Sequence, residues 1–303
     1  MTVIELLNWA TRCLEDQGVE NPRLNAELLL SHSLTLGREG LYVHLKDHLS
    51  DEVKDRLEKL VKRRISGEPL QYIRGKQGFW SGDFKVDPRV LIPRPETEIL
   101  VEQAISLLCA LPAGRARSVL EIGTGSGAVA ISLRREVKTI RMVATDISLE
   151  ALLLAKENAR EMGVLREIAF VNGDLFGPFH PGEGGLFDLI LSNPPYISRP
   201  EIKALPREIK EHEPTIALDG GEDGLDFYRD IATQSSSYLR KGGWLLLELG
   251  QGQGKRITEL LSERGEFLKP ELLKDFSGIE RVVKAQRKYE IRSMKSETPN
   301  ILG

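Results

Sequence analysis

Hydrophobic positions recur with two different spacings along the chain, which divides it into two main parts. Up to about residue 75 they follow the three- and four-residue spacing of amphipathic helices, as Ile4, Leu7 and Leu14 illustrate. Asn21-Pro22 and Ser50-Asp51-Glu52 are typical of helix starts. The pattern therefore predicts a small helical bundle over residues 1–75.

Beyond residue 98 the pattern changes to short apolar runs that alternate with helical segments. Apolar runs of strand length lie at 118–122, 140–144, 168–171, 187–192, 244–249 and 280–283. Helical patterns lie around 95–105, 128–133, 151–161, 225–239 and 255–262. This alternation predicts an α/β domain over residues 99–283, with a doubly wound, mostly parallel, Rossmann-like sheet.

Two further segments fit neither pattern. Residues 79–86 alternate like a hairpin strand, and Pro93 and Pro95 favour extended backbone before the next helix. We therefore expect residues 76–98 to form a hairpin and a linker between the two domains. Residues 284–303 are polar and unpatterned, which predicts a flexible tail.

The apolar run at 187–192 ends in Asn193-Pro194-Pro195-Tyr196, because proline cannot donate to a sheet ladder. An asparagine oxygen and the Pro194 carbonyl are two acceptors that can receive both N–H bonds of a planar NH2 group. Glutamine and adenine carry such groups, and fixed acceptors favour charge build-up on the attacking nitrogen. Tyr196 adds a flat apolar face. The alternative is a proline-rich turn that only ends a strand.

A second candidate site is the glycine-rich turn Glu121-Ile122-Gly123-Thr124-Gly125-Ser126-Gly127, which lies between a predicted strand and a helix. Its glycines permit a tight turn and close approach of a ligand to a helix N-terminus. Asp146 ends the next strand, about 20 residues further on, where a carboxylate suits two ribose hydroxyls. Both NAD and S-adenosylmethionine carry such a ribose, so these residues do not distinguish between the two cofactors.

Composition and charge narrow the class of protein. A net charge of −3 over 303 residues gives no global basic field, which disfavours stable nucleic-acid binding. The two cysteines have no metal-like spacing, and His44 and His48 lack a third ligand, so no metal site is expected. No signal peptide and no membrane-spanning stretch is predicted. The expected setting is cytoplasmic.

In combination, the glycine-rich turn, Asp146 and Asn193-Pro194-Pro195-Tyr196 resemble the class I S-adenosylmethionine-dependent methyltransferases that act on planar NH2 groups. The chain more specifically resembles the HemK-type family, the peptide chain release factor glutamine methyltransferases. The motifs that carry this resemblance are residues 91–98, Glu213-Pro214, Ala217-Leu218, Gly220-Gly221, Asp223-Gly224-Leu225, residues 247–250 and Gln253. The similarity covers residues 1–283.

The resemblance implies an enzyme that methylates the side-chain nitrogen of the glutamine in the Gly-Gly-Gln motif of class 1 release factors. Residues 1–75 would recognise this protein substrate, and the enzyme is expected to be a monomer. No metal and no covalent intermediate are required, because the glutamine nitrogen would attack the methyl group directly.

The family's functional residues are carried over onto the matching positions. The cofactor's methionine end would be held by Gly123, Thr124, Gly125, Ser126 and Gly127, and its ammonium group by Glu121. Asp146 would bind the ribose, and the adenine would lie beside Asp174 and Leu175. Asn193 would bridge cofactor and substrate, and Pro194 would supply the second acceptor. Tyr196 would pack on the glutamine, with Pro195 beside it in the substrate site.

Other classes of protein share parts of this pattern. A glutamine methyltransferase for a ribosomal protein would have the same catalytic turn and differ in the N-terminal bundle. An adenine methyltransferase would need a basic groove for phosphates, which the net charge disfavours. An NAD-dependent dehydrogenase fits the glycine-rich turn and leaves the Asn-Pro-Pro-Tyr turn unexplained. A non-catalytic module that binds the cofactor is a fourth alternative.

Overall fold

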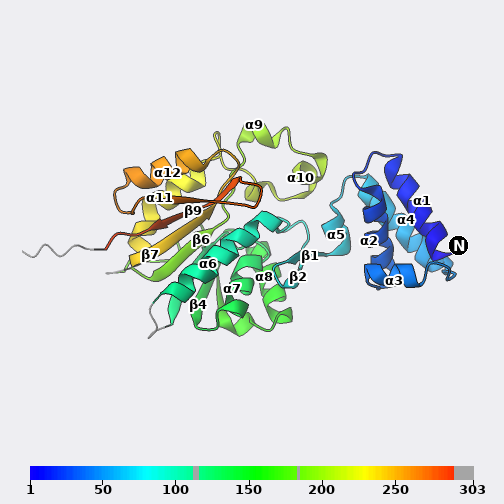
Figure 1. Ribbon diagram of the computed structural model, residues 1–303, viewed down its shortest axis with the longest axis horizontal. Helices are drawn as coiled ribbons and strands as arrows, with labels where there is room; N and C mark the ends of the chain where they lie inside the picture. The colour runs from blue at the N-terminus through cyan, green and yellow to red at the C-terminus, as the bar shows by residue number, and fades with distance from the viewer. Residues whose placement is uncertain (112–115, 183–184, 290–303) are drawn as a thin grey trace, which may run out of the picture.

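The computed structural model describes residues 1–111, 116–182 and 185–289. A small helical bundle lies at one end of the molecule (Figure 1). Its helices are α1 (Val3–Glu15), α2 (Pro22–Leu34), α3 (Arg38–Val43), α4 (Asp51–Ile65) and α5 (Leu70–Arg74). A capping box begins α1, since the Thr2 hydroxyl accepts the Glu5 N–H and the Glu5 carboxylate accepts the Thr2 N–H. Leu6, Leu29 and Leu57, each fully buried, belong to a core of the bundle's own.

A hairpin connects the bundle to the larger domain (Figure 1). Its strands are β1 (Lys76–Phe79) and β2 (Gly82–Lys85), which pair antiparallel. Asn158 fixes the hairpin to the domain, because its side chain accepts the Lys85 N–H and donates to the carbonyls of Lys85 and Ser126. The 3-10 turn η1 (Pro95–Thr97) then leads into α6 (Glu98–Ala110).

The larger domain is built on a seven-stranded sheet with the order β5-β4-β3-β6-β7-β9-β8. The strands are β3 (Arg117–Ile122), β4 (Ile140–Asp146), β5 (Ile168–Asn172), β6 (Phe187–Ser192), β7 (Leu239–Glu248), β8 (Glu271–Lys274) and β9 (Glu280–Gln286). The first five in this order are parallel, and β9 is antiparallel to both neighbours. The predicted doubly wound, mostly parallel sheet is confirmed.

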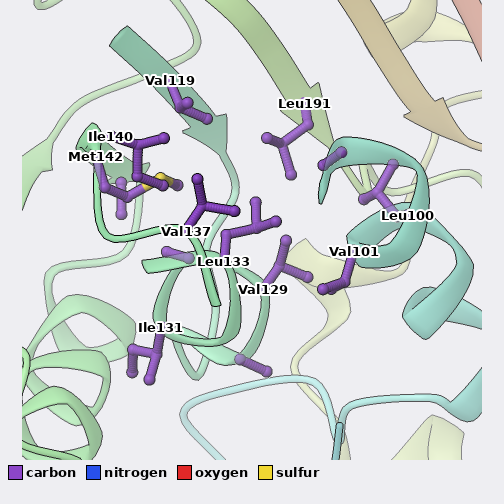
Figure 2. Packing of buried hydrophobic residues seen from close by; sticks show 14 of the residues in the cluster. Leu100, Val101, Val119, Val129, Ile131, Leu133, Val137, Ile140, Met142 and Leu191 are labelled. Atoms are coloured by element: carbon purple, nitrogen blue, oxygen red, sulfur yellow. The ribbon is translucent and has the colours of Figure 1, made fainter. Parts of the chain in front are cut away.

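Helices cover both faces of this sheet. Besides α6 they are α7 (Ala128–Glu136), α8 (Leu149–Glu161), α11 (Asp226–Tyr238) and α12 (Gly254–Glu263). On one face, Val119 and Leu191 of the strands point toward Leu133 of α7 (Figure 2). On the other face, the strands pack against α11 and α12 through Tyr228 and Ile257. The alternation of strand side chains thus supplies two separate cores.

The structure also contains short elements that the hydrophobic pattern did not predict. Between β6 and α11 it has α9 (Arg199–Ile202), α10 (Arg207–His212) and η3 (Thr215–Ala217), and η2 (Leu165–Glu167) precedes β5. The edge strand β8 is also additional, and β7 begins at Leu239, five residues before the predicted start. Such pieces carry no long periodic pattern and are stabilised by tertiary contacts.

The predicted tail begins too early. Lys284, Ala285 and Gln286 continue β9, where Ala285 is buried and paired with Leu245 of β7. The polar side chains that suggested a tail alternate with inward-facing Val283 and Ala285, so they occupy the outer positions of a strand. Arg287 also pairs, in an isolated bridge with Phe267, and residues 290–303 of the predicted tail lie outside the described residues.

Candidate active site

A cavity of about 380 Å³ opens at the carboxyl ends of the parallel strands, the edge where open α/β sheets bind ligands. Most residues singled out from the sequence line it: Glu121, Gly123, Thr124, Gly125, Ser126, Asp146, Asp174, Leu175, Asn193, Pro194 and Pro195. Gly127 and Tyr196 are not lining residues, although each directly follows one, Ser126 and Pro195, in the chain. Segments more than 70 residues apart in the chain therefore meet around one cavity.

The three glycines of the turn after β3 have different surroundings. Gly123 and Gly125 have φ angles of +72° and +54°, and a Cβ added to either would meet no atom within 4 Å. The backbone atoms of these two glycines are therefore not covered by side chains on the cavity side. Gly127, with φ +81°, precedes α7, and a Cβ there would lie 2.9 Å from Ile131 Cδ1. Close packing therefore leaves no room for a side chain at Gly127, whereas Gly123 and Gly125 leave room for a ligand.

Asp146 connects the glycine-rich turn to the start of α8. One carboxylate oxygen accepts the Gly125 N–H at 2.8 Å, and the other accepts the Ser148 N–H at 2.9 Å. Burial raises the pKa of Asp146, and these backbone N–H groups oppose the shift. The carboxylate is thus held in one orientation at the cavity wall.

Glu121 is a buried acid at the end of β3, with 4% of its surface exposed. Its Oε2 accepts the Thr124 hydroxyl at 2.6 Å and the Ala130 N–H at 3.1 Å. Burial raises its pKa to about 8, against the effect of both donors, and the charge of Asp146 adds to the increase. A cation that entered the cavity here would favour the ionised form of Glu121.

Asp174 and Leu175 line the cavity from the turn that follows β5. Leu175 has a φ of +44°, which is uncommon for a residue with a Cβ. The turn is fixed by two backbone hydrogen bonds, Gly173 N–H to the Asp146 carbonyl and Gly177 N–H to the Asp174 carbonyl. Residues held in this region of φ cluster at functional sites.

Asn193 follows β6, and its side chain has a defined partner. Its Nδ2 donates to the Thr97 hydroxyl of η1 over 3.2 Å. Within the described part of the chain, no group donates a hydrogen bond to its Oδ1. The amide nitrogen is thus engaged with the protein, and the oxygen is left for a ligand.

A buried carboxyl, that of Glu248, lies beside this pair at the end of β7. The Glu248 residue is 2% exposed. Burial raises its pKa to about 7, and hydrogen bonds from Thr97 and Asn193 oppose the shift. Neither Thr97 nor Glu248 is among the site residues predicted from the sequence. The available signal was an acid within the apolar run of β7, Leu245-Leu246-Leu247-Glu248-Leu249.

Gln253 fixes the other side of the Asn-Pro-Pro-Tyr turn. Its Nε2 donates to the carbonyls of Tyr196 and Gly224 at 2.9 and 3.3 Å, and its Oε1 accepts the Gly250 N–H at 3.0 Å. Tyr196 itself is partly buried against the core that contains Tyr228, and burial raises its pKa to about 12. Three loops at this edge of the sheet are therefore joined by one side chain.

Another part of the cavity wall comes from the linker and from the loop between β6 and α11. Arg94 and Glu213 join these segments by an ion pair in which Nη2 and Oε1 lie 2.5 Å apart. Pro214, Ile216 and Ala217 follow directly and line the cavity. The loop also contacts the bundle, because Arg64 Nη2 lies 2.7 Å from Glu208 Oε2.

The described part of the chain meets the requirements of neither a metal site nor a membrane-spanning helix. No cluster of three or more His, Cys, Asp or Glu residues suited to a metal ion occurs there, and His44 and His48 are exposed. No helix among the same residues has the length and apolar character needed to span a membrane.

Comparison with known families gives two matches, which together span most of the chain. The PrmC N-terminal domain model matches residues 5–75, and the methyltransferase small domain model matches residues 101–212. The first match covers the helical bundle, and the second covers β3 to α10 with the cavity's main lining residues.

Full-length relatives are similar over almost the whole chain. The release factor glutamine methyltransferase of Geobacter sulfurreducens is 43% identical over 282 residues, 93% of this chain and 95% of that protein. The same enzyme of Moorella thermoacetica is 40% identical over 290 residues, 96% of this chain and 100% of that protein. A methyltransferase structure from Pyrococcus furiosus shares the fold, with a TM-score of 0.51 at 18% identity over 70% of this chain and 92% of that one.

Proposed function

The chain belongs to the family of release factor glutamine methyltransferases, and from this membership we propose its reaction and the residues that perform it. The protein transfers a methyl group from S-adenosylmethionine to the side-chain amide nitrogen of a glutamine in class 1 peptide chain release factors. The target is the glutamine of the Gly-Gly-Gln motif. The observation that carries the proposal is the orientation of Asn193, whose amide nitrogen binds Thr97 and whose oxygen is left to accept from a substrate.

The residues around the cavity fit S-adenosylmethionine, which when bound supplies an electrophilic methyl group on a sulfonium sulfur. Gly123 and Gly125 offer bare backbone beside the helix N-terminus, with open space where side chains would otherwise lie. Glu121 offers a buried carboxyl for the ammonium group, and Asp146 offers a fixed carboxylate for the ribose hydroxyls. Thr124 and Ser126 complete the turn, Gly127 supports it, and Asp174 and Leu175 border the adenine.

Asn193 and Pro194 act on the glutamine amide as two fixed acceptors. The Asn193 Oδ1 and the Pro194 carbonyl would each accept one N–H of the planar NH2 group, which aims the nitrogen and favours positive charge on it during attack. Pro195 and Tyr196 hold the turn and offer an apolar surface to the glutamine side chain. No general base is needed, since an amide nitrogen that has used its lone pair becomes a strong acid.

The helical bundle is the proposed recognition domain for the protein substrate. It touches the cavity's loop through Arg64 and Glu208, so substrate bound along both would lie near the catalytic turn. We further propose that the enzyme is monomeric and cytoplasmic. It should form no stable complex with nucleic acid, in keeping with its net charge of −3.

Peptide-mapped mass spectrometry tests this function. The enzyme and S-adenosylmethionine are incubated separately with a class 1 release factor, a ribosomal-protein mixture and adenine-containing DNA. We expect one added methyl group on the glutamine of the Gly-Gly-Gln motif, and none on a release factor in which that glutamine is replaced by asparagine. Methylation confined to a ribosomal protein or to DNA would overturn the substrate assignment.

A further inference from the structure

We propose that Glu248 and Thr97 are positioning residues for Asn193: together they fix its amide with the oxygen toward the glutamine, and ionised Glu248 places negative charge behind that oxygen. This inference rests on the function proposed above. It concerns two buried polar residues that act through Asn193; of the two, Thr97 lines the cavity and Glu248 does not.

The sheet brings these residues together. Strands β6 and β7 are parallel neighbours, and Ser192 pairs with Leu247. The next residues along the two chains, Asn193 just after β6 and Glu248 at the end of β7, therefore lie side by side at the carboxyl edge of the sheet. Thr97 reaches the same point from η1, and its hydroxyl accepts the Asn193 Nδ2–H over 3.2 Å.

Burial makes this contact selective for one orientation of the amide. Thr97 and Glu248 are 5% and 2% exposed, so little solvent reaches either side chain to replace a lost hydrogen bond. A hydroxyl that accepts from Asn193 still has its own proton to donate, and the neighbouring Glu248 carboxylate can only accept. A flipped Asn193 would turn its oxygen toward this carboxylate and would lose the hydrogen bonds that its NH2 group donates, including one to a charged group.

One carboxyl oxygen of Glu248 is not used for hydrogen bonding within the described residues. Its Oε2 is buried and has no hydrogen-bond partner among the described residues. A buried carboxyl oxygen without a hydrogen bond lowers the stability of the fold, so its presence calls for a functional explanation. Here the explanation is electrostatic: the attacking nitrogen becomes more positive as it takes the methyl group, and a carboxylate behind the acceptor stabilises that charge in a low-dielectric site.

The charge of Glu248 depends on pH near neutrality. Burial raises its pKa to about 7, and nearby Glu96 adds to this, whereas Thr97, Arg281 and Asn193 lower it. Two phenols also interact with it, those of Tyr196 and Tyr228. A raised pKa means that Glu248 is protonated below about 7 and ionised above, so methyl transfer should accelerate as the pH rises through this value.

Matched variants separate positioning from packing. Thr97→Val removes the hydroxyl at constant shape, and Thr97→Ser keeps it. Glu248→Gln removes the charge at nearly constant shape and replaces one acceptor oxygen with an NH2 group. Thr258→Val on α12 is the control, because it deletes another partly buried, hydrogen-bonded hydroxyl of the same domain. For each protein, kcat, KM for the release factor, affinity for S-adenosylmethionine and thermal unfolding are measured.

We expect Thr97→Val to lower kcat by about 10²-fold, as misplacement of a catalytic group does, with little change in cofactor affinity. Thr97→Ser and Thr258→Val should retain most of the wild-type kcat. Glu248→Gln should lower kcat above neutral pH and abolish the increase of kcat through pH 7. Equal kcat values for the valine and serine variants at Thr97, or an unchanged pH profile in Glu248→Gln, would overturn the inference.

A direct readout does not depend on the identity of the substrate. In protein labelled with ¹⁵N-asparagine, the side-chain NH2 signals of Asn193 are assigned by their loss in Asn193→Asp. These signals should shift with an apparent pKa near 7 in the wild type and not in Glu248→Gln, and they should exchange faster with solvent in Thr97→Val. If the Asn193 signals are unaffected by pH, by Glu248→Gln and by Thr97→Val, this inference is contradicted. A wild-type enzyme that methylates no release factor contradicts only the proposed function.

Discussion

Arg94 and Glu213 are 119 residues apart in the chain, yet Arg94 Nη2 lies 2.5 Å from Glu213 Oε1. The Glu213 side chain is 1% exposed, and its other oxygen accepts the Ile92 N–H at 3.2 Å. The linker before α6 is thereby joined to the loop that carries Pro214 and Ile216. One ion pair thus holds two walls of the cavity together.

Loss of this ion pair should destabilise the protein and loosen the cavity. Arg94→Ala leaves a buried carboxylate with only a backbone donor, which should lower the free energy of unfolding by about 3–5 kcal/mol. The double variant Arg94→Ala, Glu213→Ala should lose much less than the sum of the single variants. Urea unfolding and the affinity for S-adenosylmethionine are the measurements.

A surface pair provides the comparison for Arg94. Arg207 and Glu211 form an exposed ion pair on α10, with 66% and 45% of their side chains accessible. Arg207→Ala should cost at most about 1 kcal/mol. Equal losses of stability in Arg94→Ala and Arg207→Ala would contradict the structural importance assigned to the buried pair.

Substitution of Gly125 should weaken cofactor binding without unfolding the protein. Gly125 has a φ of +54° and open space at its missing Cβ, so Gly125→Ala should cost about 1–2 kcal/mol of stability from backbone strain. Gly163 is the control, because it has a φ of +74° and equally open surroundings, and lies outside the cavity lining. Both variants should lose similar stability, and only Gly125→Ala should lose affinity for S-adenosylmethionine.

Glu121 should couple cofactor binding to proton release. Its pKa is raised to about 8, so it is largely protonated at neutral pH in the free protein. A bound ammonium group would lower that pKa, and the proton would leave on binding. Affinity for S-adenosylmethionine should therefore rise with pH up to about 8 and then level off.

Calorimetry in buffers with different ionisation enthalpies measures this proton release. At neutral pH the wild type should release most of one proton per cofactor bound. Glu121→Gln should bind more weakly and release less, with any residual release attributed to Asp146, whose pKa burial also raises. Identical proton release by the wild type and Glu121→Gln would remove Glu121 from the ammonium site.

Asn193→Ala should reduce turnover far more than cofactor affinity. The variant removes an acceptor that matters most as charge develops on the attacking nitrogen, for which losses of about 10²–10³ in kcat are typical. Single-turnover methylation of the release factor gives the rate, and equilibrium titration gives the affinity. Near-normal turnover by Asn193→Ala would exclude the proposed role, whatever its effect on binding.

The alternation of elements and the residues at the strand ends could be predicted from the sequence, because both are recorded locally. Hydrophobic periodicity distinguishes strands from helices within a few residues, and proline and glycine mark where strands stop. Parallel strands bring their carboxyl ends to one edge, so Gly123, Asp146 and Asn193 could be expected at one site. The structure places all three around the same cavity.

The tertiary structure alone decided which side chains support that site. Glu248 lies beside Asn193 because β7 pairs with β6, and Thr97 meets both because η1 ends there. Likewise, the raised pKa of Glu121 results from burial by surrounding elements. Strand order and burial are set by packing between distant segments, and no local pattern in the chain records them.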